Sequence, residues 1–235
     1  MSVILSVDTS TPACSVALNI DGVVLEDFRM APRMHNDLIL PMVDQILSQA
    51  ELTLSQVDAI AFGRGPGSFT GLRIAAGVVQ GLAYGADLPV IPVSTLEAMA
   101  LDAYRKYKTA LWLPALDARM GEIYVAGYRV FEEEGMTSIE ALLPESVVKP
   151  DALDDLNDAF NGVGSGWCYK EVLLTKIPTT PNTIDIDIAP RAACIAELAG
   201  KLFAKNRMVP VYEAMPSYLR DEISWEKQPL KVGKR

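Results

Sequence analysis

Several residue types that would narrow the function at once are scarce in this sequence. Its three cysteines, Cys14, Cys168 and Cys194, lie far apart with no CxxC pair. This spacing argues for a reducing cytosol and against a disulfide framework or a zinc site. The chain has a single histidine, His35, which excludes a metal site built on two histidines.

Positive charge and long apolar runs are also in short supply. Lysine and arginine number 21 against 30 acidic residues, and the net charge of −9 repels nucleic acid from the chain as a whole. A role with RNA would therefore need a local basic patch or a partner. No apolar run approaches the roughly 18–20 residues that cross a membrane, and Met1–Asp8 has no basic leader. We expect a cytoplasmic protein without a membrane contact.

A cluster of positive charge lies at the end of the sequence. Lys227, Lys231, Lys234 and Arg235 form this basic tail. A solvated, frayed end accounts for it without any function, and contact with tRNA is the alternative.

The sequence is rich in regular hydrophobic patterning. Half of the residues are hydrophobic, enough for a sizeable core in one large domain or in two domains of about 100 residues. Three meandering strands with a hairpin turn at Asp21-Gly22 precede alternating helices and strands, which predicts a mixed sheet covered by helices. The predicted strands are Val3–Asp8, Ser15–Ile20, Val23–Arg29, Val57–Phe62 and Val90–Val93, and the predicted helices are His35–Ala50, Leu72–Ala86 and Thr95–Tyr104.

The second half opens in the same way as the first. Ala110–Asp117 is predicted to be a strand that ends in an acid, and Glu122–Val130 is predicted to return beside it. Asp117 thus takes the place that Asp8 has in the first half. The remaining predictions are an irregular stretch at Phe131–Ala159 with one helix inside Asp151–Ala159, a strand at Ile184–Ile188 and a helix after Pro190.

This repetition predicts two domains, at 1–103 and 104–235. Each half opens with a strand that ends in an acid, followed by a turn and a returning strand. Two such halves resemble the duplicated fold of actin, Hsp70 and the acetate and sugar kinases (the ASKHA fold). We therefore expect a two-lobed ASKHA-like α/β protein, with mixed sheets flanked by helices and a reduced second lobe. The resemblance implies that the two turns hold the phosphates of ATP, and a stand-alone ATP-dependent enzyme is one function that this fold would allow.

The two turns differ in how well they suit a phosphate. The first, Asp8-Thr9-Ser10-Thr11, offers hydroxyls and backbone N–H groups, whereas the second, at 117–121, lacks paired glycines and a hydroxyl. Asp117, Arg119 and Glu122 could contact a nucleotide or a partner, or simply fix the hairpin by a salt bridge. The residues predicted to contact a nucleotide or an anion are Asp8, Thr9, Ser10, Arg64 and Arg119.

A glycine-rich loop within Val57–Ala86 joins a strand to a helix and first suggests a phosphate cradle. It does not match the P-loop, because Leu72-Arg73 stands where Lys and Ser or Thr are required. It does not match the dinucleotide fingerprint, because Gly65-x-Gly67 is followed by Gly71 rather than by a glycine three residues on. Anion binding at the flanking arginines and a structural turn that sets helix packing are the two interpretations.

A closer resemblance rests on seven motifs that span most of the chain. In order, they are VDTSTPACSVAL, HNDLILPMVDQIL, FGRGPGSFTGLRI, IPVSTLEAMA, LDARMGEIY, GVGSGW and PSYLRDEISW. Together they resemble the TsaB family of bacterial tRNA threonylcarbamoyladenosine biosynthesis proteins. The resemblance implies a cytosolic pseudo-enzyme that pairs with its paralogue TsaD, which transfers threonylcarbamoyl to the adenosine next to the anticodon. It also implies a ternary complex with the ATPase TsaE, and contact with tRNA only through the complex.

The resemblance also implies which chemistry is missing. TsaD holds its catalytic metal with an HxxxH pair on the helix after the fifth strand, where this sequence has Thr95 and Met99. A hydroxyl and a thioether do not replace two imidazoles. We therefore predict no catalytic residue, no metal and no cofactor, and a protease acting on TsaD is a further alternative. His35 and Cys14 could form a nucleophile–base pair, but nothing in the sequence places them together.

The helix after the glycine-rich loop carries Gly77, Gly81 and Gly85 at intervals of four residues. Glycine in an exposed helix costs about 1 kcal/mol relative to alanine, so the stripe indicates close contact with another helix. Packing against the chain's own sheet would also suit small residues. The family resemblance implies instead a four-helix bundle with TsaD, or a homodimer when TsaD is absent. The predicted interface residues are Leu38, Met42, Ile46, Arg73, Gly77, Gly81 and Gly85.

Overall fold

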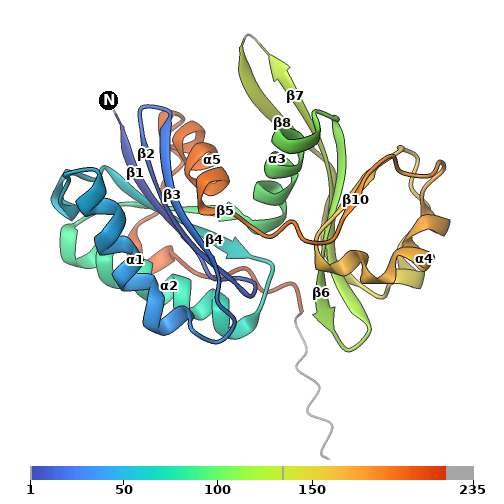
Figure 1. Ribbon diagram of the computed structural model, residues 1–235, viewed down its shortest axis with the longest axis horizontal. Coiled ribbons are helices and arrows are strands. Elements are labelled where there is room, and N and C mark those ends of the chain that lie inside the picture. The colour runs from blue at the N-terminus through green and yellow to red at the C-terminus, as the bar shows by residue number, and fades with distance from the viewer. Residues whose placement is uncertain (1, 134, 221–235) are drawn as a thin grey trace, which may run out of the picture.

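Two lobes stand side by side in the computed structural model, which describes residues 2–133 and 135–220 (Figure 1). Each lobe is built on a five-stranded mixed sheet with helices packed against it. The basic tail lies outside the described residues. Within the described part of the chain, no helix combines the length and apolarity needed to span a bilayer.

The first sheet has the strand order β3-β2-β1-β4-β5. Its first three strands pair antiparallel, and the turn between β2 and β3 is the predicted one, with Asp21 and Gly22 both at positive φ. β4 pairs parallel with β1, and β5 pairs parallel with β4. The strands are β1 Val3–Asp8, β2 Ala13–Ile20, β3 Val23–Met30, β4 Ala59–Gly65 and β5 Val90–Ser94, and the helices within this part are α1 His35–Gln49, α2 Phe69–Ala86 and α3 Thr95–Tyr107.

The second sheet repeats the connectivity of the first. Its order, β10-β9-β6-β7-β8, again places three antiparallel strands beside two parallel ones. This duplication confirms the predicted ASKHA-like fold. β9 and β10 have three and two residues, where β4 and β5 have seven and five, so the second lobe is the reduced copy. The elements are β6 Leu111–Arg119, β7 Glu122–Glu133, β8 Met136–Val148, β9 Asn161–Val163, β10 Ile184–Asp185 and α4 Lys170–Leu173.

Helices cover the two faces of the first sheet differently. α1 and α2 bury one face, where Leu5 and Phe62 pack with Ile39 and Val79. The last helix, α5 (Ala192–Ala204), covers the opposite face, and the Ser6 hydroxyl on β1 donates to its first carbonyl at 2.8 Å. Apolar residues of both lobes join α3 and α5 in one core cluster, so the lobes share their interior at this end.

Two predictions in the second half are wrong. The stretch 131–159 is not irregular, because β8 fills 13 residues of it. No α-helix forms within 151–159, where the chain makes only the 3-10 turn Pro150–Ala152. The expected strand at 184–188 is reduced to the two residues of β10.

The predicted domain division also needs a correction. A second domain at 104–235 would contain α5, yet α5 packs on the first sheet, where Asn19 of β2 donates to the carbonyl of Ala196 at 3.2 Å. The following residues stay with the first lobe, because Val209 pairs with Val90 of β5. The second lobe therefore consists of the segment that carries β6 to β10, inserted before the chain returns.

Candidate functional site

The glycine-rich loop packs directly on the turn between β1 and β2. Three glycines, Gly63, Gly67 and Gly71 (the loop glycines), lie so close to this turn that a Cβ on any of them would meet it at 1.9–2.7 Å. The backbone N–H of Ser68 donates to the carbonyl of Ser10 at 2.7 Å, and the Thr9 hydroxyl donates to the carbonyl of Gly71 at 2.7 Å. The chain's own loop thus occupies the polar groups that the sequence offered to a phosphate.

Asp8 is buried by this packing. Its carboxylate accepts hydrogen bonds from the backbone N–H and the hydroxyl of Ser10 at one oxygen, and its other oxygen has no hydrogen-bond partner. Burial raises the pKa of Asp8 to about 7, although the two bonds from Ser10 oppose the shift. A Cβ on Gly63 would lie 1.9 Å from the unpartnered oxygen, so the loop presses on the carboxylate.

A cleft between the lobes, with a volume of about 470 Å³, lies beside this turn. Ser10 and Arg119 line it, and so does Arg220 near the end of the described chain. Asp8 and Thr9 do not line it, and each is at most 1% exposed. The first turn therefore does not fit the phosphate and metal contacts that the fold usually provides. Of the five predicted nucleotide or anion residues, the structure brings Ser10 and Arg119 together at the cleft.

The second turn, between β6 and β7, is held by its own residues. Asp117 accepts a hydrogen bond from the backbone N–H of Arg119 at 2.9 Å. It also forms an ion pair with the Arg119 guanidinium at 3.3 Å. Arg119, Met120 and Gly121 all have positive φ, which makes a tight left-handed corner. The salt bridge that fixes the hairpin is present, and the Arg119 side chain is otherwise 84% exposed.

Arg64, the fifth predicted anion residue, connects the lobes instead. Its guanidinium pairs with Glu145 of β8 at 3.0 Å. Glu145 also accepts a hydrogen bond from the hydroxyl of Ser94, at the end of β5. Burial raises the pKa of nearby Glu97, and the charge of Glu145 adds to the shift. Arg64 is therefore committed to an interlobe ion pair.

The positions that could have carried catalysis are filled by packing. Thr95 and Met99 on α3 are completely buried, and the described residues contain no group of three or more His, Cys, Asp or Glu arranged to hold a metal. His35 is buried rather than on the surface, and its Nε2 donates to the carbonyls of Thr11 and Ala13 at 2.8 and 3.1 Å. Cys14 is buried against Met42, and burial raises the pKa of its thiol to about 11. These two residues do not form a nucleophile–base pair.

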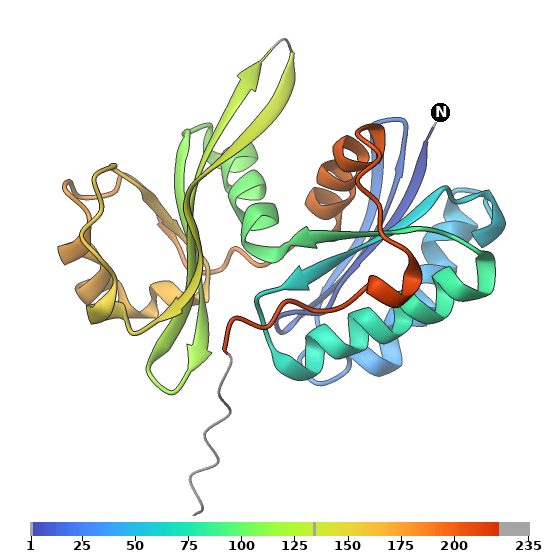
Figure 2. The same cartoon turned by 180° about the vertical axis from the view of Figure 1, so that it is seen from behind.

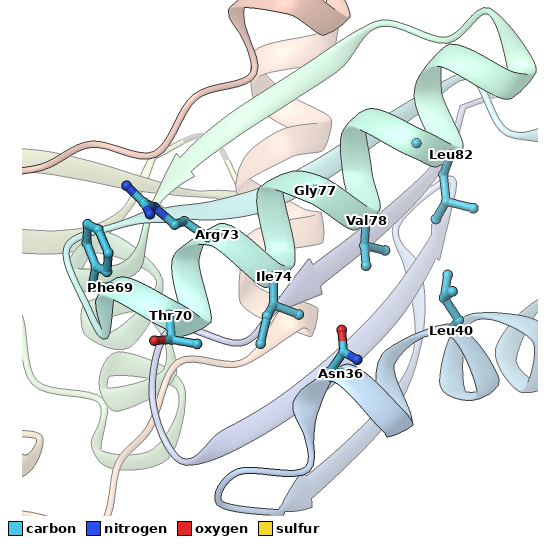
Figure 3. Close-up of a pocket in the computed structure, with 10 residues that line it drawn as sticks. Asn36, Leu40, Phe69, Thr70, Arg73, Ile74, Gly77, Val78 and Leu82 are labelled. Atoms are coloured by element: carbon cyan, nitrogen blue, oxygen red, sulfur yellow. The ribbon is translucent and has the colours of Figure 1, made fainter.

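An open groove runs between α1 and α2 on the outside of the first lobe (Figure 3). Its volume is about 700 Å³, and Asn36 and Leu40 of α1 face Ile74 and Val78 of α2 across it. The helix spacing follows from the sequence, because the apolar stripes of both helices are anchored in the sheet below. We call this surface the α1–α2 groove; its lining residues are Asn36, Leu40, Phe69, Thr70, Arg73, Ile74, Gly77, Val78, Gly81 and Leu82.

The predicted glycine stripe borders this groove and faces outward. Gly77, Gly81 and Gly85 (the stripe glycines) are exposed, and a Cβ on any of them would meet nothing within 4 Å. They therefore do not pack against the chain's own sheet. The first two and Arg73 line the groove.

Other parts of the interface prediction need correction. Met42 and Ile46 are 0% and 1% exposed, because they share the inward face of α1 with Ile39. Leu38 is only half-exposed and packs against the same core. The positions of α1 that reach the groove, Asn36 and Leu40, lie four residues apart and were missed.

The C-terminal segment is also part of this region. Tyr218 and Arg220 border a cavity of about 510 Å³ next to the start of α2, and Phe69 and Arg73 line both this cavity and the α1–α2 groove. The sequence motif PSYLRDEISW contains Tyr218 and Arg220, but their spatial neighbours lie about 100 residues or more away in the chain.

Comparison with known proteins places this architecture in a family. A family model described as TsaD, tRNA N6-adenosine threonylcarbamoyltransferase, matches residues 21–225. The tRNA threonylcarbamoyladenosine biosynthesis protein TsaB of Escherichia coli strain K12 is 42% identical over 232 residues, which cover 97% of this chain and 99% of that protein. TsaB of Haemophilus influenzae strain KW20 is 42% identical over 236 residues, covering 96% and 97%.

Solved structures agree. YeaZ from Pseudomonas aeruginosa is 42% identical, with a TM-score of 0.84 over 93% of this chain and all of that one. A second crystal structure, described as an uncharacterized protein with similarity to peptidase YEAZ from Pseudomonas aeruginosa, has a TM-score of 0.85 at 42% identity over 94% of this chain and all of that one. Since the sequence relatives and the solved structures match along nearly the whole chain, this protein belongs to the TsaB family.

Proposed function

We propose that this protein is a non-catalytic scaffold for the formation of threonylcarbamoyladenosine in tRNA. In this proposal it works in the cytoplasm by binding TsaD through the α1–α2 groove and activating it. TsaE joins the pair, and tRNA is contacted only through the complex. Membership of the TsaB family supports the role in this modification.

The observation that carries the proposal is the exposed row of stripe glycines beside an apolar groove. Each glycine lowers the stability of an exposed helix by about 1 kcal/mol relative to alanine, and a Cβ would find open space at all three. The isolated chain thus gains nothing from them. A partner helix lying against α2 would gain, because the missing side chains let two backbones approach closely.

The choice of TsaD as the partner rests on family likeness. A TsaD model matches residues 21–225 of this chain, so a TsaD protein is expected to carry helices equivalent to α1 and α2. Two related helix pairs can pack face to face as four helices around a pseudo-two-fold axis. A second copy of this chain would use the same face in the absence of TsaD.

The non-catalytic part of the proposal rests on the interior of α3 and on the first turn. Thr95 and Met99 are packed in the core. The segment that carries the loop glycines packs directly against the first turn and covers its polar groups. The buried side chains of Thr95, Met99, Asp8 and Thr9 are not accessible to a substrate. We therefore assign the transfer chemistry to the partner.

The binding test replaces Gly77 and Gly81 together with leucine. Added side chains on this row should hold a partner helix away and abolish co-elution with TsaD in gel filtration. The matched control is Glu171→Leu, which adds the same side chain at an exposed position of α4 in the second lobe. Unchanged co-elution of the double variant would refute the proposed face.

The functional test is reconstitution of the modification. Tritiated or mass-detected threonylcarbamoyladenosine should form in tRNA only when this chain accompanies TsaD, TsaE and the threonylcarbamoyl-adenylate donor, and the double leucine variant should fail. Incubation of the isolated chain with ATP and Mg²⁺ should release no phosphate. Turnover of ATP by the isolated chain would favour an ATP-dependent enzyme, and cleavage of TsaD on mixing would favour a protease.

A further inference from the structure

The last described residues of the chain cross from one lobe to the other. This segment, Ala214–Arg220 (the strap), leaves the first lobe beside α2 and ends at the β6–β7 turn (Figure 2). Its first part is tied to the first lobe by hydrogen bonds, the shorter of which go to backbone carbonyls. The side chain of Gln80 donates to the carbonyl of Ala214 at 2.9 Å, and the backbone N–H of Ser217 donates to the carbonyl of Arg64 at 2.7 Å.

The end of the strap is tied to the second lobe by one side chain. The Arg220 guanidinium donates to the carbonyl of Ala118 at 3.2 Å and forms an ion pair with Glu122. It also lies 3.9 Å from the sulfur of Met120. All three contacts belong to the β6–β7 turn, so a single arginine fixes the strap to that corner.

The middle of the strap rests on the start of α2. The rings of Tyr218 and Phe69 have centroids 5.6 Å apart, and the Tyr218 hydroxyl accepts a hydrogen bond from Arg73 at 3.1 Å. The Arg73 guanidinium in turn lies 3.7 Å from the centre of the Phe69 ring. The tilted aromatic pair and the cation–π contact are both attractive, so they hold the middle of the strap against α2.

Further contacts between the lobes lie around α3. There α3 packs against both sheets within one core cluster, and Arg64 pairs with Glu145. A packed helix between two rigid sheets is a suitable pivot for relative motion. At the β6–β7 corner, by contrast, the strap supplies the connection through groups that are partly exposed: the side chains of Arg220 and Glu122 are 28% and 29% exposed.

We propose that the strap is a clasp that sets the separation of the two lobes. While Arg220 holds the β6–β7 turn, the second lobe stays closed over the cleft that Ser10 and Arg119 line. When Arg220 is released, the second lobe turns about α3 and the cleft opens. Because exposed ion pairs are weak and screened by salt, this clasp is the reversible part of the interlobe contact.

The test measures the distance between the lobes in the full-length isolated chain. Spin labels are placed at Cys168, which is exposed in the second lobe, and at Gln49→Cys at the end of α1. The other two cysteines are buried and do not compete for the label. Double electron–electron resonance then gives the distribution of interlobe distances.

Arg220→Ala should shift this distribution to a longer mean and broaden it, and Tyr218→Ala should do the same to a smaller extent. Tyr212→Ala is the control, because Tyr212 lies just before the strap and is 76% exposed. Raising the salt concentration should broaden the wild-type distribution toward that of Arg220→Ala. An unchanged distribution in Arg220→Ala, or an equal shift in Tyr212→Ala, would overturn the proposal.

A charge exchange guards against a variant that merely disturbs the fold. Arg220→Glu should open the lobes, and adding Glu122→Arg should bring the distance back toward the wild-type value, because the ion pair is restored with reversed polarity. A double variant as open as Arg220→Glu alone would count against the clasp. These measurements need no TsaD, so their failure and the failure of the scaffold proposal are separate outcomes.

Discussion

The loop glycines and the stripe glycines lie in one continuous stretch of chain but in opposite surroundings. The loop glycines are pressed against the β1–β2 turn, where a Cβ would come within 1.9–2.7 Å of other atoms. The stripe glycines face open space on the outside of α2. The first set is required by the fold, since no other residue would fit. The second set weakens the isolated fold, so its benefit lies in something that the monomer does not contain.

The two sets of glycines therefore differ in what their substitution would test. A crowded glycine is explained by packing within one chain, so its substitution tests folding. An uncrowded glycine in a helix is explained by a partner, and its substitution tests binding.

The largest effect is expected for Gly71→Ala. The new Cβ would lie 1.9 Å from the carbonyl oxygen of Thr9. This oxygen belongs to the backbone and, unlike the end of a side chain, cannot move aside. We expect the free energy of unfolding to fall by about 3 kcal/mol, in the upper range of overpacked cores. Urea denaturation at fixed pH measures it, and Gly81→Ala in the same helix is the control. Equal effects of the two substitutions would show that the loop glycines and the stripe glycines do not differ in their importance for folding.

The crowding of the loop also predicts a pH dependence through Asp8. Its pKa is raised to about 7 by burial, whereas an unfolded aspartate titrates at about 3.9. Between these values the folded state binds the proton more tightly, so stability falls as the pH rises and levels off above about 7.

Asp8→Asn removes this titration while its side-chain oxygen can still accept the bonds from Ser10. The unfolding free energy of the variant, relative to wild type, should therefore rise by about 2.5 kcal/mol between pH 5 and pH 8. Denaturation curves at several pH values check it. A difference that stays constant with pH would mean that Asp8 is not desolvated by the loop.

The smallest effect is expected to have the opposite sign. Gly77→Ala and Gly81→Ala should each raise the free energy of unfolding of the isolated chain by about 0.5–1 kcal/mol, because alanine restricts the unfolded chain and meets no obstacle in the fold. Thermal unfolding of dilute protein measures it. A loss of stability would show that the stripe glycines serve the monomer after all.

Much of the fold could be predicted from the sequence because its strands follow simple patterns. The hairpin at Asp21-Gly22 and the two strands predicted to end in Asp8 and Asp117 were found from apolar runs and turn residues, although the second of these strands continues to Arg119. β8 was missed because it is an edge strand: it carries Pro144 and Glu145 and has half-exposed side chains, without a clear alternation. The sequence predicted a helix after Pro190, but a local pattern does not say which sheet that helix covers.

The candidate site could be predicted only in part. Spacing by four located the stripe glycines, but the sequence left open whether they face the chain's own sheet or a partner. The same periodicity failed for Met42 and Ile46, because an apolar residue on a two-sided helix fits the core as well as a groove. The ion pair of Arg220 with Glu122 joins residues 98 positions apart, and no local pattern predicts such a contact.

The return of α5 to the first sheet has a consequence for how the protein is made. The hydrogen bond from the Ser6 hydroxyl on β1 cannot form until Ala192, 186 residues later in the chain, has been synthesised. At roughly 5–20 residues per second, synthesis of the intervening chain takes roughly 10–40 s. During that time one apolar face of the first sheet, with Ile4, Ala59 and Ala61, has no helix α5 to cover it. The nascent first lobe therefore exposes this apolar face, and is prone to aggregation there, until its last helix emerges.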